Sequence, residues 1–429
     1  GNGVKNVTIK SITLTSSDSS FYESPIFSKT ISYPNLIDVT APTDGVITLP
    51  TPDTSGETRE HNIDLLSEPE NTTKQLVEGQ YGYQGEWIVN WAPITKTAGG
   101  TQGATLVWKQ TGYKVNPERQ GDIVPNTLWG CFSDVQSVQN LMHANLSTSR
   151  YRKGLWGAGL ANLIYKQRTP KKQKFHHASG GYVVGLSGET RSENIFGGAF
   201  CELFTRDKNE IASRSNAHSY LGAVYYQYNT VSLPLRLHGQ FTYCHTSNDM
   251  KTKMTEKYAP KGTSYPVLRG EWVNDCFGLE FGGSIKVPTR TLRVRTFLNI
   301  QAIYAHQEDF NEDSIAYGRK FASSDLVNLS LPIGVHISRL KGKNDFHVSV
   351  AYSPDLVRHN PHSDVYLLST PLGANWRSCG TNLARQGLLV RCGNHRAYTP
   401  HFSIFGNFTY ELRGSSRTCS GNLGSMLRF

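Results

Sequence analysis

The chain has 429 residues, of which 38% are hydrophobic and 11% aromatic, and its formal net charge is +10. This apolar content suffices for a buried core and excludes a disordered protein. No run of about 18 or more apolar residues occurs, which excludes a protein that crosses a membrane as helices. The many glycine, aromatic, serine and threonine residues predict an all-β fold.

The charge is divided unevenly along the chain. Residues 1–125 hold 9 basic and 14 acidic side chains, a net of −5, which leaves +15 for the remainder. This asymmetry predicts two parts in different surroundings. One dense basic cluster, Lys171–Lys174, is interpreted as a turn. The other basic residues are scattered, so we expect no nucleic-acid partner.

Residues 1–120 are expected to form a β-rich domain of short strands separated by turns. Prolines interrupt many segments, and proline cannot lie in a central strand. The two clearest strands are predicted at residues 86–94 and 103–114. A stack of short strands is typical of the end of a β-solenoid, and a small β-sandwich fits the same pattern.

One amphipathic helix is predicted at residues 126–147, inside a linker placed at residues 121–149. Asn126 or Thr127 can cap its start, and its apolar residues recur at spacings of three and four. About 20 residues at 1.5 Å each match the thickness of a bilayer core, but Asp134 and its polar neighbours rule out contact with lipid. The candidate pore-helix residues are Leu128, Trp129, Phe132, Asp134, Val135, Val138 and Met142.

Residues 150–429 alternate between apolar and polar positions over segments longer than ordinary strands. From Val327 to Ile337, for example, every second residue is Val, Leu or Ile. Strands of this length cross a bilayer when tilted. About twelve of them predict a transmembrane β-barrel, whose wide lumen the helix would fill. Our literal count is thirteen, and we attribute the excess to residues 363–398, which we expect to hold one strand and a long loop.

Other side chains in the predicted barrel have expected roles. Asp134 should pair with Arg293 or Arg295, because a charge in a confined pore is costly when unpaired. The last residues alternate up to a terminal aromatic, as outer-membrane barrels usually end, and Leu423, Leu427 and Phe429 are the candidate C-terminal assembly signal. Aromatic girdles at the membrane interfaces are predicted to include Tyr165, Tyr182, Tyr228, Trp272, Tyr304 and Tyr410.

No catalytic or metal-binding motif is present in the sequence. GxSxG, HExxH and P-loop patterns are absent, and the adjacent His176 and His177 are interpreted as turn residues. We therefore expect no enzyme, no cofactor and no metal, with self-cleavage at Asn140 or Asn145 as an alternative. Seven cysteines without a CxxC pair leave the disulfide pairing open, including bonds to other envelope proteins.

Three segments resemble the chlamydial polymorphic outer-membrane proteins, a family similar to the autotransporters of type V secretion. Residues 106–142 resemble the junction that precedes the barrel in that family. Residues 381–395 and 405–429 resemble its last strands. The resemblance implies a twelve-stranded barrel in the bacterial outer membrane that exports and anchors a surface-exposed β-helical passenger, an adhesin. The helix would be the linker inside the pore.

The resemblance also implies partners. They are outer-membrane lipid, the barrel-assembly machinery that reads Phe429, and a host-cell receptor bound by the passenger. The GGAI and FxxN repeats of the family are not evident in residues 1–120, and no signal peptide is visible. We therefore expect most of the passenger to be missing from this chain, and its signal to be removed or absent.

Two other functions fit parts of the pattern. A porin-like outer-membrane channel would need neither the helix nor residues 1–120. A soluble β-sandwich adhesin would pack the apolar faces against one another, and one alternating strand does not distinguish it from a barrel.

Overall fold

The computed structural model describes residues 112–146, 153–254, 266–315, 317–368 and 374–429, and before residue 112 the strands alone. The N-terminal strands form an antiparallel sheet in the order β3-β9-β8-β7, a three-stranded sheet β2-β5-β6, and a parallel pair of β1 and β4. The two strands predicted most clearly correspond to β8 and β9. The bounds are β1 Val7–Thr8, β2 Ser11–Thr13, β3 Ile26–Pro34, β4 Val39–Thr40, β5 Gly45–Pro50, β6 Thr58–Ile63, β7 Thr72–Val77, β8 Gly82–Trp91 and β9 Thr101–Lys114.

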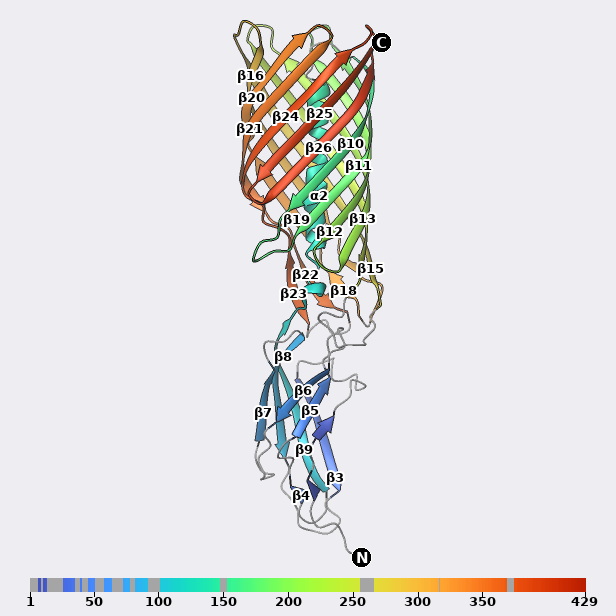
Figure 1. The fold of residues 1–429 in the computed structure, drawn as a ribbon, viewed down its shortest axis with the longest axis vertical. Helices are drawn as coiled ribbons and strands as arrows, with labels where there is room; N and C mark the ends of the chain where they lie inside the picture. The colour runs from blue at the N-terminus through green and yellow to red at the C-terminus, as the bar shows by residue number, and fades with distance from the viewer. Residues whose placement is uncertain are drawn as a thin grey trace, which may run out of the picture.

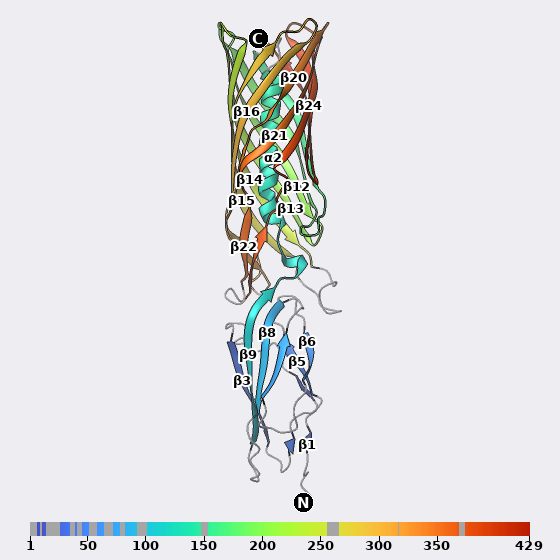
Figure 2. The same cartoon turned by 90° about the vertical axis from the view of Figure 1, so that its left-hand side faces the viewer.

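A closed antiparallel barrel of twelve strands follows (Figures 1 and 2), as the alternation predicts. It closes where the first strand, β10, pairs with the last, β26. β19 and β20 are two halves of one wall strand, since both pair with β16 and β21, and they separate at Leu331 and Pro332 because proline has no N–H for the ladder. The strands are β10 Gly154–Lys166, β11 Phe175–Glu189, β12 Ile195–Asn209, β13 Ser213–Asn229, β14 Leu235–Thr252, β15 Leu268–Val287, β16 Arg293–Gln307, β19 Ser324–Ser330, β20 Ile333–Lys341, β21 Asn344–His359, β24 Gln386–Ala397, β25 Phe402–Arg413 and β26 Ser416–Leu427.

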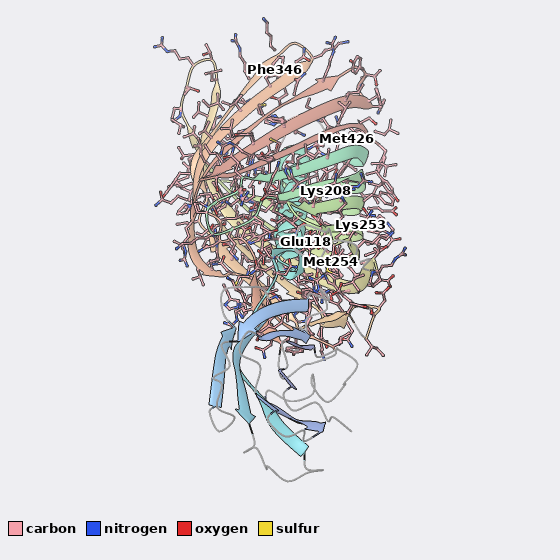
Figure 3. All side chains as sticks on the ribbon, turned by 60° about the horizontal axis from the view of Figure 1, so that its bottom comes forward. Glu118, Lys208, Lys253, Met254, Phe346 and Met426 are labelled. Atoms are coloured by element: carbon pink, nitrogen blue, oxygen red, sulfur yellow. The ribbon has the colours of Figure 1, made fainter. Side chains whose placement is uncertain are left out.

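The outer surface of the barrel is apolar. On β21, Phe346, Val348 and Val350 are 46–48% exposed, whereas Ser349 between them is 6% exposed and faces the lumen. Figure 3 shows side chains on both sides of the wall, with Phe346 and Met426 near one end of the barrel. This is the inverse of a soluble β-protein, and an apolar belt of this kind faces lipid.

Most of the residues predicted for the aromatic girdles face outward, as a girdle requires. Tyr165, Tyr182, Tyr228 and Tyr304 are exposed on the outer surface, and Tyr410 is half-buried. The prediction for Trp272 is wrong. Its side chain is buried and stacks on Phe310 with ring centroids 4.5 Å apart, because the connection after β16 folds back over it.

The two ends of the barrel differ in their connections. One, the long-loop end, carries residues 253–267, 308–323 and 360–385. The other, the short-turn end, carries the C-terminus and the turns at residues 190–194, 230–234, 288–292, 342–343 and 398–401. The chain enters at the long-loop end and begins its first wall strand at the short-turn end, so it runs through the barrel before it builds the wall.

A small four-stranded sheet, the cap sheet, lies at the long-loop end in the order β17-β18-β22-β23. Two of its strands come from residues 363–398, where the sequence predicted one wall strand and a long loop, and β24 is that wall strand. Residues 363–398 therefore contribute one strand to the barrel wall, as predicted, and the thirteenth strand of the literal count is not a wall strand. The cap sheet consists of β17 Phe310–Asn311, β18 Arg319–Phe321, β22 His362–Leu367 and β23 Asn375–Cys379.

The lumen contains helix α2, Ile123–Leu146, and both views show it inside the ring of strands (Figures 1 and 2). A short 3-10 helix, η1 at Pro117–Arg119, precedes it. α2 begins three residues before the predicted start, since Pro125 fits its first turn, where the missing N–H costs nothing. The predicted end of the linker, residues 147–149, lies outside the described residues. Among the described helices, none has the length and apolarity to cross a membrane.

Candidate functional site: the helix inside the barrel lumen

One side of α2 is apolar and fully enclosed. The predicted pore-helix residues all lie inside the barrel, and eight apolar residues of the helix are 0% exposed: Ile123, Val124, Leu128, Val135, Val138, Leu141, Met142 and Leu146. Each such side chain contributes about 1.5–3 kcal/mol when it is buried. The helix lies against strands β11 to β16, where the wall presents Val183, Leu203 and Leu221 to it. The lumen is therefore apolar on this side.

A buried polar network fixes the middle of the helix to the wall. Asp134 of α2 accepts hydrogen bonds from Ser179 at 2.6 Å and Asn162 at 2.8 Å. Its Oδ1 also lies 3.0 Å from Nε2 of His177, whose Nδ1 is 2.6 Å from Asp207. Both carboxylates and the imidazole are almost completely buried. Removal of Asp134 would leave buried donors of Ser179, Asn162 and His177 without their shared acceptor, which is costly in a low dielectric.

The network corrects two predictions. Asp134 does not pair with Arg293 or Arg295. Arg293 donates to Asp345 at 2.6 Å and Arg295 to Ser284 at 2.9 Å, because both arginines lie nearer the short-turn end. His177 is not a turn residue but an inward-facing residue of β11. The alternation of that strand could have revealed it, whereas its pairing with a helix far away in sequence could not.

Glycines on both surfaces allow this close approach. A Cβ at Gly130 of α2 would lie 2.5 Å from Nδ1 of His177. On the wall, a Cβ at Gly278 would lie 2.5 Å from Cγ1 of Val135. The helix and the wall therefore contact each other through positions that any larger side chain would block.

At the long-loop end, the connection before β24 is attached to the first turns of α2. The backbone N–H of Thr381 donates to Oδ1 of Asn126 at 2.7 Å, and Nε1 of Trp129 donates to the Thr381 carbonyl at 2.8 Å. The guanidinium of Arg358 lies 5.2 Å above the Trp129 ring. The prediction that Asn126 or Thr127 caps the helix is therefore wrong, since both lie inside α2, and Asn126 instead contacts the connection before β24.

The cap sheet closes over the helix entrance. Gly121, with φ of +76°, turns the chain between η1 and α2 directly beneath Phe321. Arg319 forms a fully buried ion pair with Glu312 and donates to the carbonyl of Arg119 at 2.8 Å. An apolar cluster that includes Ile123, Val124, Phe310 and Phe321 fills the space around these groups.

Asp122, just before α2, is a titratable group at this entrance, and folding changes its pKa. Its side chain is buried and accepts a hydrogen bond from Ser378 of β23 at 3.1 Å. Burial raises the pKa of Asp122 above the usual range, and the nearby charge of Lys172 and the Ser378 hydrogen bond oppose this only in part.

The candidate C-terminal signal residues face away from the lumen. Leu423 and Phe429 are each 69% exposed, and Leu427 is also exposed.

Four cysteines, at positions 131, 201, 244 and 276, are buried in the barrel interior, whereas Cys379 is half-buried in the cap sheet. Among the described residues, no group of three or more His, Cys, Asp or Glu is placed to hold a metal ion.

Comparison with known proteins identifies the architecture. The family model for the autotransporter beta-domain matches residues 155–409. The chain belongs to this family. The autotransporter is 38% identical over 372 residues to the probable outer membrane protein pmp10 of Chlamydia pneumoniae, covering 81% of this chain and 39% of that protein. It is 34% identical to the probable outer membrane protein pmp7 of the same organism, covering 99% and 45%.

These relatives make it a chlamydial polymorphic outer-membrane autotransporter, located in the outer membrane and in contact with lipid. The chain spans less than half the length of the curated relatives it matches. Its fold resembles the translocator domain of autotransporter NalP from Neisseria meningitidis, with a TM-score of 0.57, 14% identity, and coverage of 71% of this chain and 99% of that one. The transport unit of AIDA-I from Escherichia coli matches with a TM-score of 0.52, the same identity and the same coverage.

Proposed function

We propose that this chain is a translocator that exports its own N-terminal part through the barrel and anchors it at the cell surface. The observation that carries the proposal is the course of the chain. α2 threads the lumen from the long-loop end to the short-turn end, where β10 begins. Outer-membrane barrels have long loops outside and short turns in the periplasm. The N-terminal strands would therefore lie outside the cell.

The direction of transport follows from the same geometry. No ATP site is expected from the sequence, so folding of the N-terminal strands outside the cell would oppose back-sliding. The helix then stays in the lumen, held by its apolar side and by the Asp134 network. The domain boundaries that we propose are residues 1–120 for the passenger remnant, 121–149 for the linker and 150–429 for the barrel.

Surface exposure tests the proposal directly. The full chain, with an epitope near its N-terminus, is expressed in the outer membrane of a Gram-negative host, and intact cells are treated with a protease. We expect loss of the epitope and survival of the barrel. A periplasmic marker controls for membrane integrity. An epitope that is digested only after permeabilisation would contradict export.

The porin-like alternative predicts a different conductance. In planar bilayers, the intact chain should conduct little, because α2 and the cap sheet occupy the lumen and its long-loop end. Deletion of residues 126–146 should open a wide pore. Conductance that is high in the intact chain and unchanged by the deletion would favour a channel function instead.

The adhesin function, the host-cell receptor and the assembly machinery are proposed because the chain resembles the family. We propose that the exported part binds a host-cell receptor and that the assembly machinery recognises the last strand. Bacteria that display the full chain should adhere to host cells more than bacteria that display an unrelated autotransporter. Equal adherence would remove the adhesin role of the passenger part present in this chain and leave the translocator role intact.

A further inference from the structure

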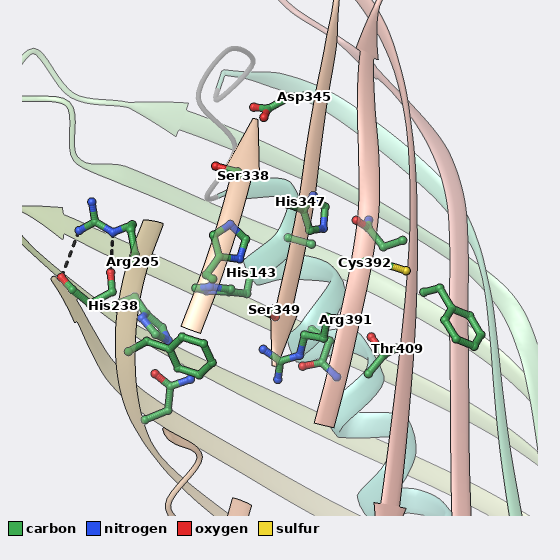
Figure 4. A pocket seen from close by; sticks show the side chains of 18 of the residues that line it. His143, His238, Arg295, Ser338, Asp345, His347, Ser349, Arg391, Cys392 and Thr409 are labelled. Atoms are coloured by element: carbon green, nitrogen blue, oxygen red, sulfur yellow. Dashed lines mark hydrogen bonds between the residues drawn. The ribbon is translucent and has the colours of Figure 1, made fainter. Parts of the chain in front are cut away.

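A cavity lies in the lumen between the polar side of α2 and the wall from β14 round to β26 (Figure 4). It has a volume of about 90 Å³ and reaches Arg293 and Asp345, beside the turns of the short-turn end. Its lining is strongly basic and includes the arginines and histidines Arg236, Arg293, Arg295, Arg391, His143, His238, His336 and His347.

Carboxylates neutralise only part of this charge. Asp345 pairs with Arg293 at 2.6 Å. Glu280, next to the cavity, lies 3.0 Å from Nε2 of His238. Arg295 donates only to uncharged acceptors in the described part of the chain, the hydroxyl and carbonyl of Ser284 and the Pro234 carbonyl.

Arg391 of β24 is the least satisfied of these side chains. Its Nε is buried and has no hydrogen-bond partner within the described residues. No carboxylate of that part of the chain forms an ion pair with Arg391 or Arg295. The charges of Glu280 and Glu411 act on this guanidinium through space, but neither carboxylate is bonded to it in the described part of the chain. A guanidinium without a directly bonded counter-charge is costly to bury, and its five donors, arranged as a fork, are suited to an oxyanion.

The helix does not supply the missing charge. The last turn of α2, including His143, borders the cavity, and a helix C-terminus acts as about half a negative charge. This partial charge is smaller than the charge of Arg295 and Arg391 together. The cavity therefore has room and donors for an anion.

We propose that this cavity binds a small multivalent oxyanion of the phosphate type, held chiefly by Arg391, with Arg295 adding positive charge to the same lining. Hydroxyl groups of Ser338, Ser349 and Thr409 line the same space and provide further donors. Charge-assisted hydrogen bonds from guanidinium groups to phosphate are short and strong. The barrel wall separates the cavity from lipid, so the ligand is a soluble anion that enters at the short-turn end. This inference does not depend on passenger export.

Calorimetric titration of the full-length protein tests the proposal. The protein is purified in a phosphate-free detergent and titrated with pyrophosphate, with inorganic phosphate and chloride compared at equal ionic strength. We expect saturable binding of pyrophosphate and no comparable binding of chloride. The double variant Arg295→Gln/Arg391→Gln should weaken it at least about tenfold.

Arg290→Gln is the matched control. Arg290 is exposed in the β15–β16 turn at the same end of the barrel, outside the cavity, and its loss should leave binding unchanged. A gel shift on boiling establishes that each variant is folded. Several outcomes would overturn the proposal: no saturation up to about 10 mM pyrophosphate, equal weakening in the control, full binding in the double variant, or binding only when phospholipid is added.

Discussion

Asp134 on the pore helix lies 3.0 Å from His177 on the barrel wall, and both side chains are almost completely buried. This contact joins the segment that threads the lumen to the wall that encloses it. The same imidazole reaches Asp207 on the neighbouring strand through its other nitrogen. The helix is therefore held at its middle by a buried hydrogen bond between side chains, as well as by apolar packing.

Asp134→Ala should detach the middle of the helix. The substitution leaves His177, Ser179 and Asn162 without their shared acceptor, and a broken buried ion pair costs about 3–5 kcal/mol. Chemical denaturation of the refolded barrel measures this loss. The control is Glu210→Gln, which removes the exposed partner of Arg168 and should cost about 1 kcal/mol or less. Equal effects of the two substitutions would show that the Asp134 network does not hold the helix.

Gly130→Ala should destabilise the barrel, although alanine is favoured over glycine in a helix by about 1 kcal/mol. The added methyl group would lie 2.5 Å from the His177 ring, which its two carboxylate partners hold in place. Overpacking of this kind costs about 1–3 kcal/mol. Gly222→Ala is the control, since a Cβ there has no neighbour within 4 Å. A stabilised Gly130→Ala variant would mean that the helix shifts freely in the lumen.

Docking of the cap sheet should weaken as the pH rises. Because the pKa of Asp122 is raised in the folded state by burial, the folded cap binds this proton more tightly than the unfolded chain does. The resulting stability is fully present below the ordinary pKa of aspartate and is lost as the pH rises through the raised value. Asp122→Asn keeps an acceptor for Ser378 and should remove this loss.

Hydrogen exchange of β22 and β23, corrected for intrinsic rates, measures the effect. At neutral pH we expect greater protection in Asp122→Asn than in the unaltered protein. Asp364→Asn serves as the control, because Asp364 pairs with Arg377 on the exposed side of the same sheet. Protection that is independent of both pH and Asp122 would contradict the assignment.

Deletion of Phe429 should reduce assembly in cells and leave refolding in detergent unchanged. The side chain is 69% exposed, so its loss removes no core packing. The amount of barrel that shifts on boiling, compared in membranes and after refolding, separates the two effects. Val231→Ala, at an exposed residue of a turn at the same end, should affect neither. An equal deficit in both settings would indicate a structural role instead.

Cys379 is the cysteine that we expect to form bonds with other envelope proteins. It lies outside the barrel in the cap sheet, whereas Cys201 is buried within the wall. On non-reducing gels of whole envelopes, Cys379→Ser should reduce the high-mass species that contain this chain, and Cys201→Ser should not. Persistence of these species in Cys379→Ser would exclude this cysteine as the link.

The sequence predicted helices and strands correctly where the pattern that indicates them lies within one short segment of the chain. The period of two along residues 327–337 was enough to predict a strand, its repetition in about twelve long segments favoured a barrel, and the spacing of Leu128, Val135 and Val138 was enough to predict the helix. The terminal alternation ending in Phe429 likewise needed no structure. These patterns are local because neighbouring residues on one face of a strand or helix meet the same surroundings.

The partners of buried charges were decided only by the closed barrel. Asp134 pairs with His177 rather than with an arginine, because barrel closure and helix depth set which wall residues it reaches, and neither is encoded in local spacing. Trp272 is likewise covered by a segment distant in sequence, the connection that carries Phe310. The basic cavity around Arg391 arises from strands far apart in sequence that closure brings together.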